Sequence, residues 1–256
     1  MLLALDAGNT NVTIGVFNGR DLTARWRLRT IHDQTADEWG ILILNLLGMS
    51  SLSAPVIDGI AISTVVPPLR TPLSEMAERY FHLQPLFIDD KTDTGLTICY
   101  ENPGDVGADR IVNSLAAFQK YGGPCVAVDL GTAITFDVIS AKAEYLGGII
   151  FPGIGVSTGA LFARTARLPK VDIRDPGKLI GTNTVGSIQS GLFWGYISVI
   201  DGLLEKLIAE LGPDTKTVAT GGQARLIFES SRLLQHLDDD LTLEGLRIAW
   251  DRSRRS

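Results

Sequence analysis

Cysteine and histidine are scarce in this chain of 256 residues, which has two cysteines and three histidines. Cys99 and Cys125 are far apart in the sequence and lie near none of the histidines. This spacing fits neither a zinc site nor a disulfide framework. We interpret both cysteines as buried strand residues of a protein in a reducing compartment, and we expect a cytoplasmic location.

Basic clusters and long apolar runs are also missing. The net charge is −6, and the only cluster of basic residues is Arg252, Arg254 and Arg255, which we interpret as a solvated end. This balance argues against nucleic acid or an anionic membrane as the principal partner. No apolar run approaches the ~18 residues of a membrane-spanning helix. The first residues show no basic region with a cleavage site, so we expect no export signal.

The sequence contains no G-x-x-x-x-G-K-[ST] motif, so it does not predict a P-loop protein. The nearest glycine pattern is Gly153-x-Gly155-x-x-x-Gly159, in which the third glycine is one residue too late for a dinucleotide fingerprint. We interpret it as close backbone packing or as a helix N-terminus facing a ligand. Any phosphate site must therefore use other turns.

The chain does have an apolar strand that ends in a carboxylate. Residues 2–6 run into the turn Ala7-Gly8-Asn9-Thr10-Asn11, and residues 12–17 return as a second apolar run. This pattern predicts a β-hairpin with polar groups at its tip. The glycine lets the backbone approach a ligand, and the Asn and Thr residues offer donors. The turn suits a nucleotide phosphate with its cation, although an ordinary hairpin turn remains the alternative.

The same pattern returns at residues 125–138. A strand ends at Asp129, Leu130-Gly131-Thr132-Ala133 forms a turn, and residues 134–138 run back. A repeated strand-Asp-x-Gly hairpin suggests two related halves that present phosphate-facing turns to a shared cleft.

Hydrophobic periodicity predicts strands alternating with helices, which favours a mixed or parallel sheet covered by helices. The further strands are expected at 22–28, 57–66, 85–88, 96–100, 144–151 and 217–220. Helices are expected at 36–48, 71–80, 108–121, 156–164 and 184–211, from Gly222 to Ser230, and at 243–250. The run Gly122-Gly123-Pro124 ends one helix and marks a boundary near residue 120. Gly186, Gly191, Gly195 and Gly202 in the long helix predict close backbone packing, against another helix or a second subunit.

Asp109 and Arg110 form the sharpest acid–base pair. Asp109 could accept a proton from a hydroxyl during phosphoryl transfer, and Arg110 could hold a carboxylate or a developing charge. The alternative is a helix N-cap beside a surface cation. Tyr100, Thr132 and Thr184 lie near glycine turns or a helix start, where they could serve only their local structure. We interpret Asp238-Asp239-Asp240 as a solvated acidic turn.

Taken together, these motifs closely resemble the type III pantothenate kinases, of the superfamily that holds acetate and sugar kinases, heat-shock proteins and actin. The motifs occur in the family's order along nearly the whole chain: DAGNTNVTIGVF, ISTVVP, YENPGDVGADR, DLGTAITFDVI, YLGGIIFPGIGVS, GTNTVGSIQSG, ATGGQA and LTLEGLRI. The resemblance implies an α/β protein with two ribonuclease-H-like domains, residues 1–120 and 121–256, around a nucleotide cleft. It also implies ATP-dependent phosphorylation of pantothenate to 4'-phosphopantothenate, the first step of coenzyme A biosynthesis.

The resemblance also implies roles for individual residues. Asp109 would be the general base, and Asp129 would help to bind the required monovalent cation, K⁺ or NH₄⁺. Asp6 would orient the Mg²⁺ that accompanies ATP, and the protein would be a homodimer. The ATP contacts would be Asp6, Ala7, Gly8, Asn9, Thr10, Asn11, Val12, Thr13 and Thr132. Pantothenate would contact Tyr100, Gly107, Ala108, Asp109, Arg110 and Thr184. In a homodimer, Thr184 could act from the neighbouring subunit.

Two other classes of function compete with this one. A sugar kinase or polyphosphate-cleaving phosphatase of the same superfamily would share the Asp-x-Gly turns but lack the GADR loop with Tyr100 upstream. A regulatory paralogue would keep the fold and bind ligand without turnover. The four intact charged residues Asp6, Asp109, Arg110 and Asp129 argue against it.

Overall fold

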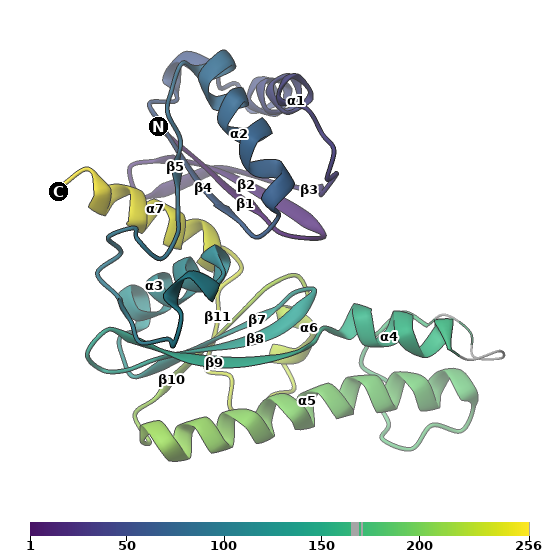
Figure 1. Ribbon diagram of the computed structural model, residues 1–256. Helices are drawn as coiled ribbons and strands as arrows, with labels where there is room; N and C mark the ends of the chain where they lie inside the picture. Colours follow the sequence, from purple (N-terminus) through teal and green to yellow (C-terminus); the bar gives the residue numbers. More distant parts are fainter. Residues whose placement is uncertain (165–168, 170, 256) are drawn as a thin grey trace. The chain divides into compact units, whose positions relative to one another are not determined.

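The computed structural model describes residues 1–164, 169 and 171–255. The chain forms two compact units (Figure 1). Unit 1 comprises Met1–Ala116 together with Asp240–Ser256, and unit 2 comprises Ala117–Asp239. The domain boundary expected near residue 120 stays a prediction. The compact units differ from the expected ranges in that residues 240–256 belong with the N-terminal half.

Unit 1 is built on a sheet in the order β3-β2-β1-β4-β5. The first three strands pair antiparallel as a meander, whereas β4 and β5 continue the sheet in parallel. The strands are β1 (Leu2–Ala7), β2 (Asn11–Asn18), β3 (Asp21–Arg29), β4 (Gly59–Thr64) and β5 (Leu86–Phe87). Both faces of β1 and β4 are buried, which explains their continuous apolar runs.

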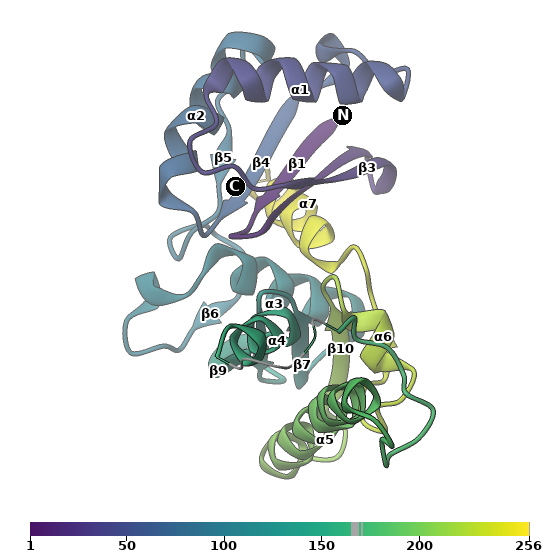
Figure 2. The same cartoon turned by 90° about the vertical axis from the view of Figure 1, so that its right-hand side faces the viewer.

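Helices cover both faces of this sheet. Helices α1 (Ala36–Met49) and α2 (Arg70–Met76) pack together on one face, and α7 (Leu241–Ser253) packs against β1, β2 and β4 on the other (Figure 2). Helix α1 begins at a capping box in which Thr35 and Glu38 exchange hydrogen bonds. Helix α7 approaches so closely that a Cβ on Gly59 would overlap the ring of Trp250. The main core of unit 1 lies between the sheet and α1 and α2, around Trp39, Ile43 and Ile62.

Unit 2 repeats this arrangement. Its strands are β7 (Cys125–Leu130), β8 (Ala133–Ile139), β9 (Glu144–Pro152), β10 (Lys216–Thr220) and β11 (His236–Leu237), and they follow the order β11-β10-β7-β8-β9. As in unit 1, a three-strand antiparallel meander continues into two parallel strands. The two related halves predicted from the repeated hairpin are therefore confirmed.

The helices of unit 2 are α4 (Ile154–Ala163), α5 (Thr184–Leu211) and α6 (Ala224–Phe228). Helix α5 runs along one side of the unit (Figure 1), and Phe193, Ile197 and Ile200 on it join the core formed by β7 and β8. The predicted bounds of α5 are confirmed at both ends. Gly191 and Gly195 are exposed and Gly202 is half-buried, and a Cβ at any of the three would meet no described atom within 4 Å beyond the helix's own nearby backbone. Only Gly186 has closer neighbours, in Asn183 and Gly181, so close packing of the other three against a second subunit stays a prediction.

The remaining elements are short, apart from α3 (Ala108–Tyr121), which begins in unit 1 and ends in unit 2. They are the 3-10 helices Ala54–Val56, Pro67–Leu69 and Pro103–Asp105, a π-helical turn at Ala77–Phe81, and strand β6 (Thr97–Ile98). The predicted strand 96–100 is thus shorter than expected. None of the helices in the described ranges combines the length and apolar character that crossing a membrane requires.

The structure tests three local predictions, on Cys125, Cys99 and the acidic run 238–240. Cys125 is buried in β7 as predicted, and burial raises the pKa of its thiol to about 12. Cys99 contradicts the prediction, because it is exposed and lies just after β6. The acidic run 238–240 is a solvated turn only in part, because Asp239 and Asp240 form a turn with Asp239 exposed, whereas Asp238 is buried, and all three carboxylates have basic partners.

Candidate active site

The first candidate element is the turn between β1 and β2. Asp6 lies opposite Thr13 in the hairpin register, and the Gly8 amide donates to the Asn11 carbonyl at 3.0 Å. Thr30, which follows β3, holds the turn from the side by donating its hydroxyl to the Gly8 carbonyl at 2.6 Å. With its backbone fixed in this way, the turn leaves Asn9 and Thr10 exposed at its tip. Both side chains are polar and face solvent.

Asp6 itself is fixed by the neighbouring parallel strand. Ser63 of β4 pairs with Asp6 in register, and its hydroxyl donates to Asp6 Oδ1 at 2.8 Å. Ser63 was not singled out from the sequence. The motif ISTVVP contains it, but its contact with Asp6 follows only from the pairing of β1 with β4.

The second candidate element is the turn between β7 and β8 in unit 2. Asp129 lies opposite Thr135, and the Gly131 amide donates to the Ala133 carbonyl at 3.0 Å. This turn is one residue shorter than the first, because Leu130 pairs with Ile134 whereas Ala7 pairs with Val12. Thr132 is exposed at its tip.

Glycines keep the surroundings of Asp129 clear of side chains. Gly221 follows β10 with φ +95°, and a Cβ there would overlap Asp129 Oδ1. Gly153 begins α4 against the second turn, and its amide donates to the Thr132 carbonyl at 3.1 Å. The sequence pattern marks Gly153 as close backbone packing or a helix N-terminus facing a ligand, and Gly221 as a glycine turn at a strand end, where α/β sheets place ligands. The structure shows that they leave room at the carboxylate and at the turn.

Asp109 is the second residue of α3, and the N-cap role weighed for it is wrong. The helix begins at Ala108, and the carbonyl of Gly107 accepts from the Ile111 amide. The Asp109 carboxylate is half-buried, and its Oδ1 accepts from the Arg110 amide at 2.8 Å. Burial raises the pKa of Asp109, although this amide and the positive charge of Arg110 act in the opposite direction. A carboxylate with a raised pKa is a better proton acceptor than an ordinary surface carboxylate.

Gly107 connects Asp109 to the first turn. A Cβ on Gly107 would lie 2.5 Å from Asp109 Oδ1 and 3.3 Å from Cγ1 of Val65, so only glycine leaves this space free. Val65 in turn donates its amide to the Ala7 carbonyl at 3.2 Å. Unit 1 therefore brings the first turn and the GADR loop, 100 residues apart in sequence, into one neighbourhood. Arg110 is buried beside them.

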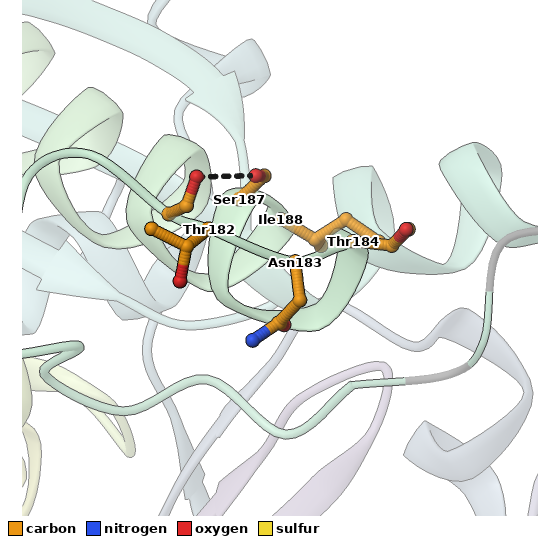
Figure 3. Close-up of a pocket in the computed structure, with 6 residues that line it drawn as sticks. Thr182, Asn183, Thr184, Ser187 and Ile188 are labelled. Carbon is orange, nitrogen blue, oxygen red and sulfur yellow. Dashed lines mark hydrogen bonds between the residues drawn. The ribbon is translucent and has the colours of Figure 1, made fainter.

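Thr184 lies in unit 2 at the start of α5, beside a surface cavity of about 600 Å³ (Figure 3). The cavity is lined by Gly181, Thr182, Asn183, Thr184, Ser187 and Ile188. Asn183 caps the helix, because its Oδ1 accepts from the Gly186 amide at 2.8 Å. The Ser187 hydroxyl donates to the Gly181 carbonyl at 3.3 Å (Figure 3). Tyr100, in unit 1, lies half-exposed in the loop after β6.

The oxygen atoms around Asp6 and Asp129 suit cations that are coordinated partly by the protein and partly by nucleotide phosphates. Across the described part of the chain, no three His, Cys, Asp or Glu side chains gather as a ready-made metal cage. Each turn instead offers one carboxylate close to hydroxyls and backbone. Mg²⁺ bound with nucleotides commonly has one or two protein carboxylates, phosphate oxygens and water as ligands. A single aspartate at each turn is therefore sufficient.

Comparison with solved structures identifies the fold. The activator of 2-hydroxyisocaproyl-CoA dehydratase from Clostridium difficile, solved with bound ADPNP, matches with a TM-score of 0.55 at 12% identity, over 100% of this chain and 97% of that one. Component A of (R)-2-hydroxyglutaryl-CoA dehydratase from Acidaminococcus fermentans matches with a TM-score of 0.56 at 11% identity, over 97% and 95%. The duplicated fold is that of the actin-like ATPases and sugar kinases, as expected.

Sequence comparison narrows the class to one family. The family model of type III pantothenate kinase matches residues 2–206. A type III pantothenate kinase from Solibacter usitatus is 60% identical over 253 residues, which cover 99% of this chain and 97% of the relative. Another, from Koribacter versatilis, is 56% identical over 265 residues, with coverage of 99% and 96%. The chain belongs to the type III pantothenate kinase family.

Proposed function

We propose that this protein transfers the γ-phosphoryl group of ATP to the primary hydroxyl of pantothenate and so makes 4'-phosphopantothenate, the first intermediate of coenzyme A biosynthesis. The observation that carries the proposal is that the first turn and the GADR loop both lie beside Val65 in unit 1, in a chain of this family. Because ATP is the phosphoryl donor, we place the reaction in the cytoplasm. Phosphoryl transfer to an alcohol requires positioning, charge neutralisation and a proton acceptor rather than covalent catalysis.

The two Asp-x-Gly turns supply the nucleotide contacts in this proposal. Asp6–Thr13 contributes backbone amides and the exposed side chains of Asn9 and Thr10, and Thr132 contributes from the second turn. Asp6 would orient Mg²⁺, and Asp129 would hold K⁺ or NH₄⁺. When bound, these cations neutralise phosphate charge. The hydrogen bond from Ser63 fixes the Asp6 carboxylate for this role.

Asp109 is the proposed general base. The pantothenate hydroxyl oxygen forms a bond to the γ-phosphorus of ATP while the bond between that phosphorus and the leaving ADP breaks. The hydroxyl proton passes to the Asp109 carboxylate. A carboxylate with a raised pKa holds that proton better than an exposed one does, and such general-base catalysis typically contributes about 10²–10⁴-fold. Arg110, Tyr100, Gly107, Ala108 and Thr184 would contact pantothenate, whose own carboxylate suits an arginine.

The protein would act as a homodimer, and one face of α5 supports this proposal. Gly191, Gly195 and Ser198 are exposed at helical spacing, and apart from the helix's own nearby backbone no described atom would lie within 4 Å of a Cβ at either glycine. Leu179 and Ile180 nearby in sequence are 69% and 79% exposed. Small residues allow two backbones to approach closely, and exposed large apolar residues favour association. Thr184 lies at the start of the same helix, where a second subunit could share it.

The test is a coupled assay of ADP release with ATP and Mg²⁺, with and without pantothenate and K⁺. We expect turnover that depends on pantothenate and is stimulated by K⁺. Turnover with a hexose in place of pantothenate would instead indicate a sugar kinase. Nucleotide binding without turnover on either acceptor would indicate a regulatory paralogue.

A further inference from the structure

The chain passes between the two compact units twice, and both crossings are flanked by paired side chains. The first crossing lies inside α3, between Ala116 and Ala117, and the second between Asp239 and Asp240. The crossings are 123 residues apart in sequence. Side chains from α3 nevertheless bind the second connection within each unit, so the two connections are tied together.

Asp238 makes this tie within unit 2. It is 8% exposed, and its Oδ2 forms an ion pair with Lys120 and accepts from the Tyr121 hydroxyl at 2.9 Å. The Tyr121 ring stacks on His236 with centroids 4.4 Å apart. Burial and the Asp238 carboxylate both raise the pKa of Tyr121, so its hydroxyl stays a donor. The last turn of α3 is thereby fixed to the end of β11.

A second tie lies within unit 1. The hydroxyl of Thr242, at the start of α7, donates to Asn113 Oδ1 on α3 at 2.7 Å. A Cβ on Gly245 would overlap the Val112 carbonyl, so the helices α3 and α7 lie in close contact there. Asp240 pairs with Arg25 of β3 at 2.6 Å. The second connection is thus anchored to α3 on both sides of the crossing.

Helix α3 also carries the proposed base. Asp109 lies at its start and Lys120 near its end, and eleven residues of α-helix span roughly 17 Å. A helix of this length is stiff compared with the segment 238–240. A displacement of the last turn is therefore expected to be carried along α3 toward Asp109.

We propose that Asp238 is a positioning residue, which locks the last turn of α3 to the returning chain and so fixes the helix that carries Asp109. The inference rests on the proposed role of Asp109. A loosened second connection would let the last turn of α3 move independently and would misplace the base.

The neighbouring aspartate provides a matched control. Asp239 pairs with Arg225 of α6 at 2.6 Å, but these side chains are 37% and 70% exposed, and neither is on α3. An exposed pair of this kind contributes little to stability. Asp238→Asn and Asp239→Asn each remove one negative charge, at neighbouring positions. Only Asp238→Asn breaks an ion pair with a residue of α3.

The first experiment measures amide hydrogen exchange of the full-length protein. Asp238→Asn should speed exchange in segments 117–121 and 236–239 by about tenfold or more, as expected for loss of a hydrogen bond to a buried charge, while α5 stays unchanged. Asp239→Asn should alter these rates less than about threefold. Tyr121→Phe keeps the ring and removes only the hydroxyl, so it should increase the local exchange rates by a smaller factor. This variant replaces Asp238→Asn in the experiment if Asp238→Asn fails to fold. Equal exchange in the Asp238, Tyr121 and Asp239 variants would overturn the lock, whatever the enzyme's activity.

The second experiment tests the link to Asp109 by a double-mutant cycle. Asp238→Asn should lower kcat about tenfold in the wild-type background but less than about twofold in the Asp109→Asn background. If Tyr121→Phe is needed in its place, the same pattern with a smaller fall is expected. A merely structural role would lower kcat equally in both backgrounds, and that result would overturn the inference. If the wild type shows no pantothenate-dependent turnover, the proposed function fails, and with it the link to Asp109, whereas hydrogen exchange still decides whether the lock exists.

Discussion

Asp6 and Asp129 occupy the same position in the two repeated sheets. Each is the fifth residue of its strand, and each lies opposite a threonine of the returning strand. Each also pairs in register with a hydroxyl residue of the neighbouring parallel strand, Ser63 for Asp6 and Thr220 for Asp129. The duplication therefore reproduces the acidic strand end together with its surroundings, whereas the turns themselves differ by one residue.

Asp109→Asn should leave the protein folded and lower kcat by about 10²–10⁴-fold, because the amide cannot accept the hydroxyl proton. The coupled ADP assay measures this loss. The raised pKa in the folded state means that wild-type stability falls as pH rises through the interval from the unfolded pKa to the folded one. At pH 7 the melting temperature of the variant should therefore equal or exceed that of the wild type. Retention of nearly full activity would disprove the base assignment.

Gly107→Ala should lower kcat/KM for pantothenate by about tenfold or more, because the added Cβ would lie 2.5 Å from Asp109 Oδ1 and displace the carboxylate. Steady-state kinetics in the coupled assay give this value. Gly104→Ala in the same loop is the control, since its Cβ would meet only Asn102 Oδ1, at 3.9 Å. Similar kinetics for the two variants would show that the space beside Asp109 is not needed.

Gly221→Ala should raise KM for ATP and weaken stimulation by K⁺, because its Cβ would overlap Asp129 Oδ1. Gly212→Ala is matched in backbone strain, with φ +107° against +95°, but it faces open space. Both changes should reduce the free energy of unfolding by about 1–3 kcal/mol. Only the first should change the nucleotide and K⁺ dependence of the rate, and the same KM in both variants would contradict this.

Asp129→Ala should abolish stimulation by K⁺, because it removes the carboxylate proposed to hold the monovalent cation. The measurement is ADP release over a K⁺ titration at constant ionic strength. Asp214→Ala, at an exposed position before β10, controls for the loss of one negative charge. Undiminished stimulation of the Asp129 variant would move the cation site elsewhere.

Gly195→Glu should dissociate the proposed homodimer, because it puts a charged side chain on the exposed small-residue face of α5. The substitution improves helix propensity by several tenths of a kcal/mol, so the monomer should stay folded. Sedimentation velocity measures the change. Ala209→Glu, exposed near the end of the same helix, should leave the dimer intact. A wild type that sediments as a fully active monomer would remove the shared-site proposal.

The family, the duplicated fold and the bounds of helix α5 could be predicted from the sequence, because their signals are local. The two strand-Asp-x-Gly hairpins stand out through alternating polarity and turn residues, each within about fifteen positions. The residue roles carried by the resemblance remain predictions. For the first turn and the GADR loop, the neighbourhood in unit 1 depends on Val65, which donates its amide to Ala7 and lies beside Gly107, although these segments are far apart in sequence.

Other features were decided only by tertiary structure. Residues 243–250 have the periodicity of a helix, but their place in unit 1 depends on the space left at Gly15 and Gly59 for Leu243 and Trp250. Asp238 looks like part of a solvated acidic run until Lys120 and Tyr121 enclose it. Local sequence fixes backbone preference over a few residues, whereas burial and charge pairing depend on which distant segments the fold brings together. That is why the sequence predicted the Asp-x-Gly turns but not the surroundings of Asp238.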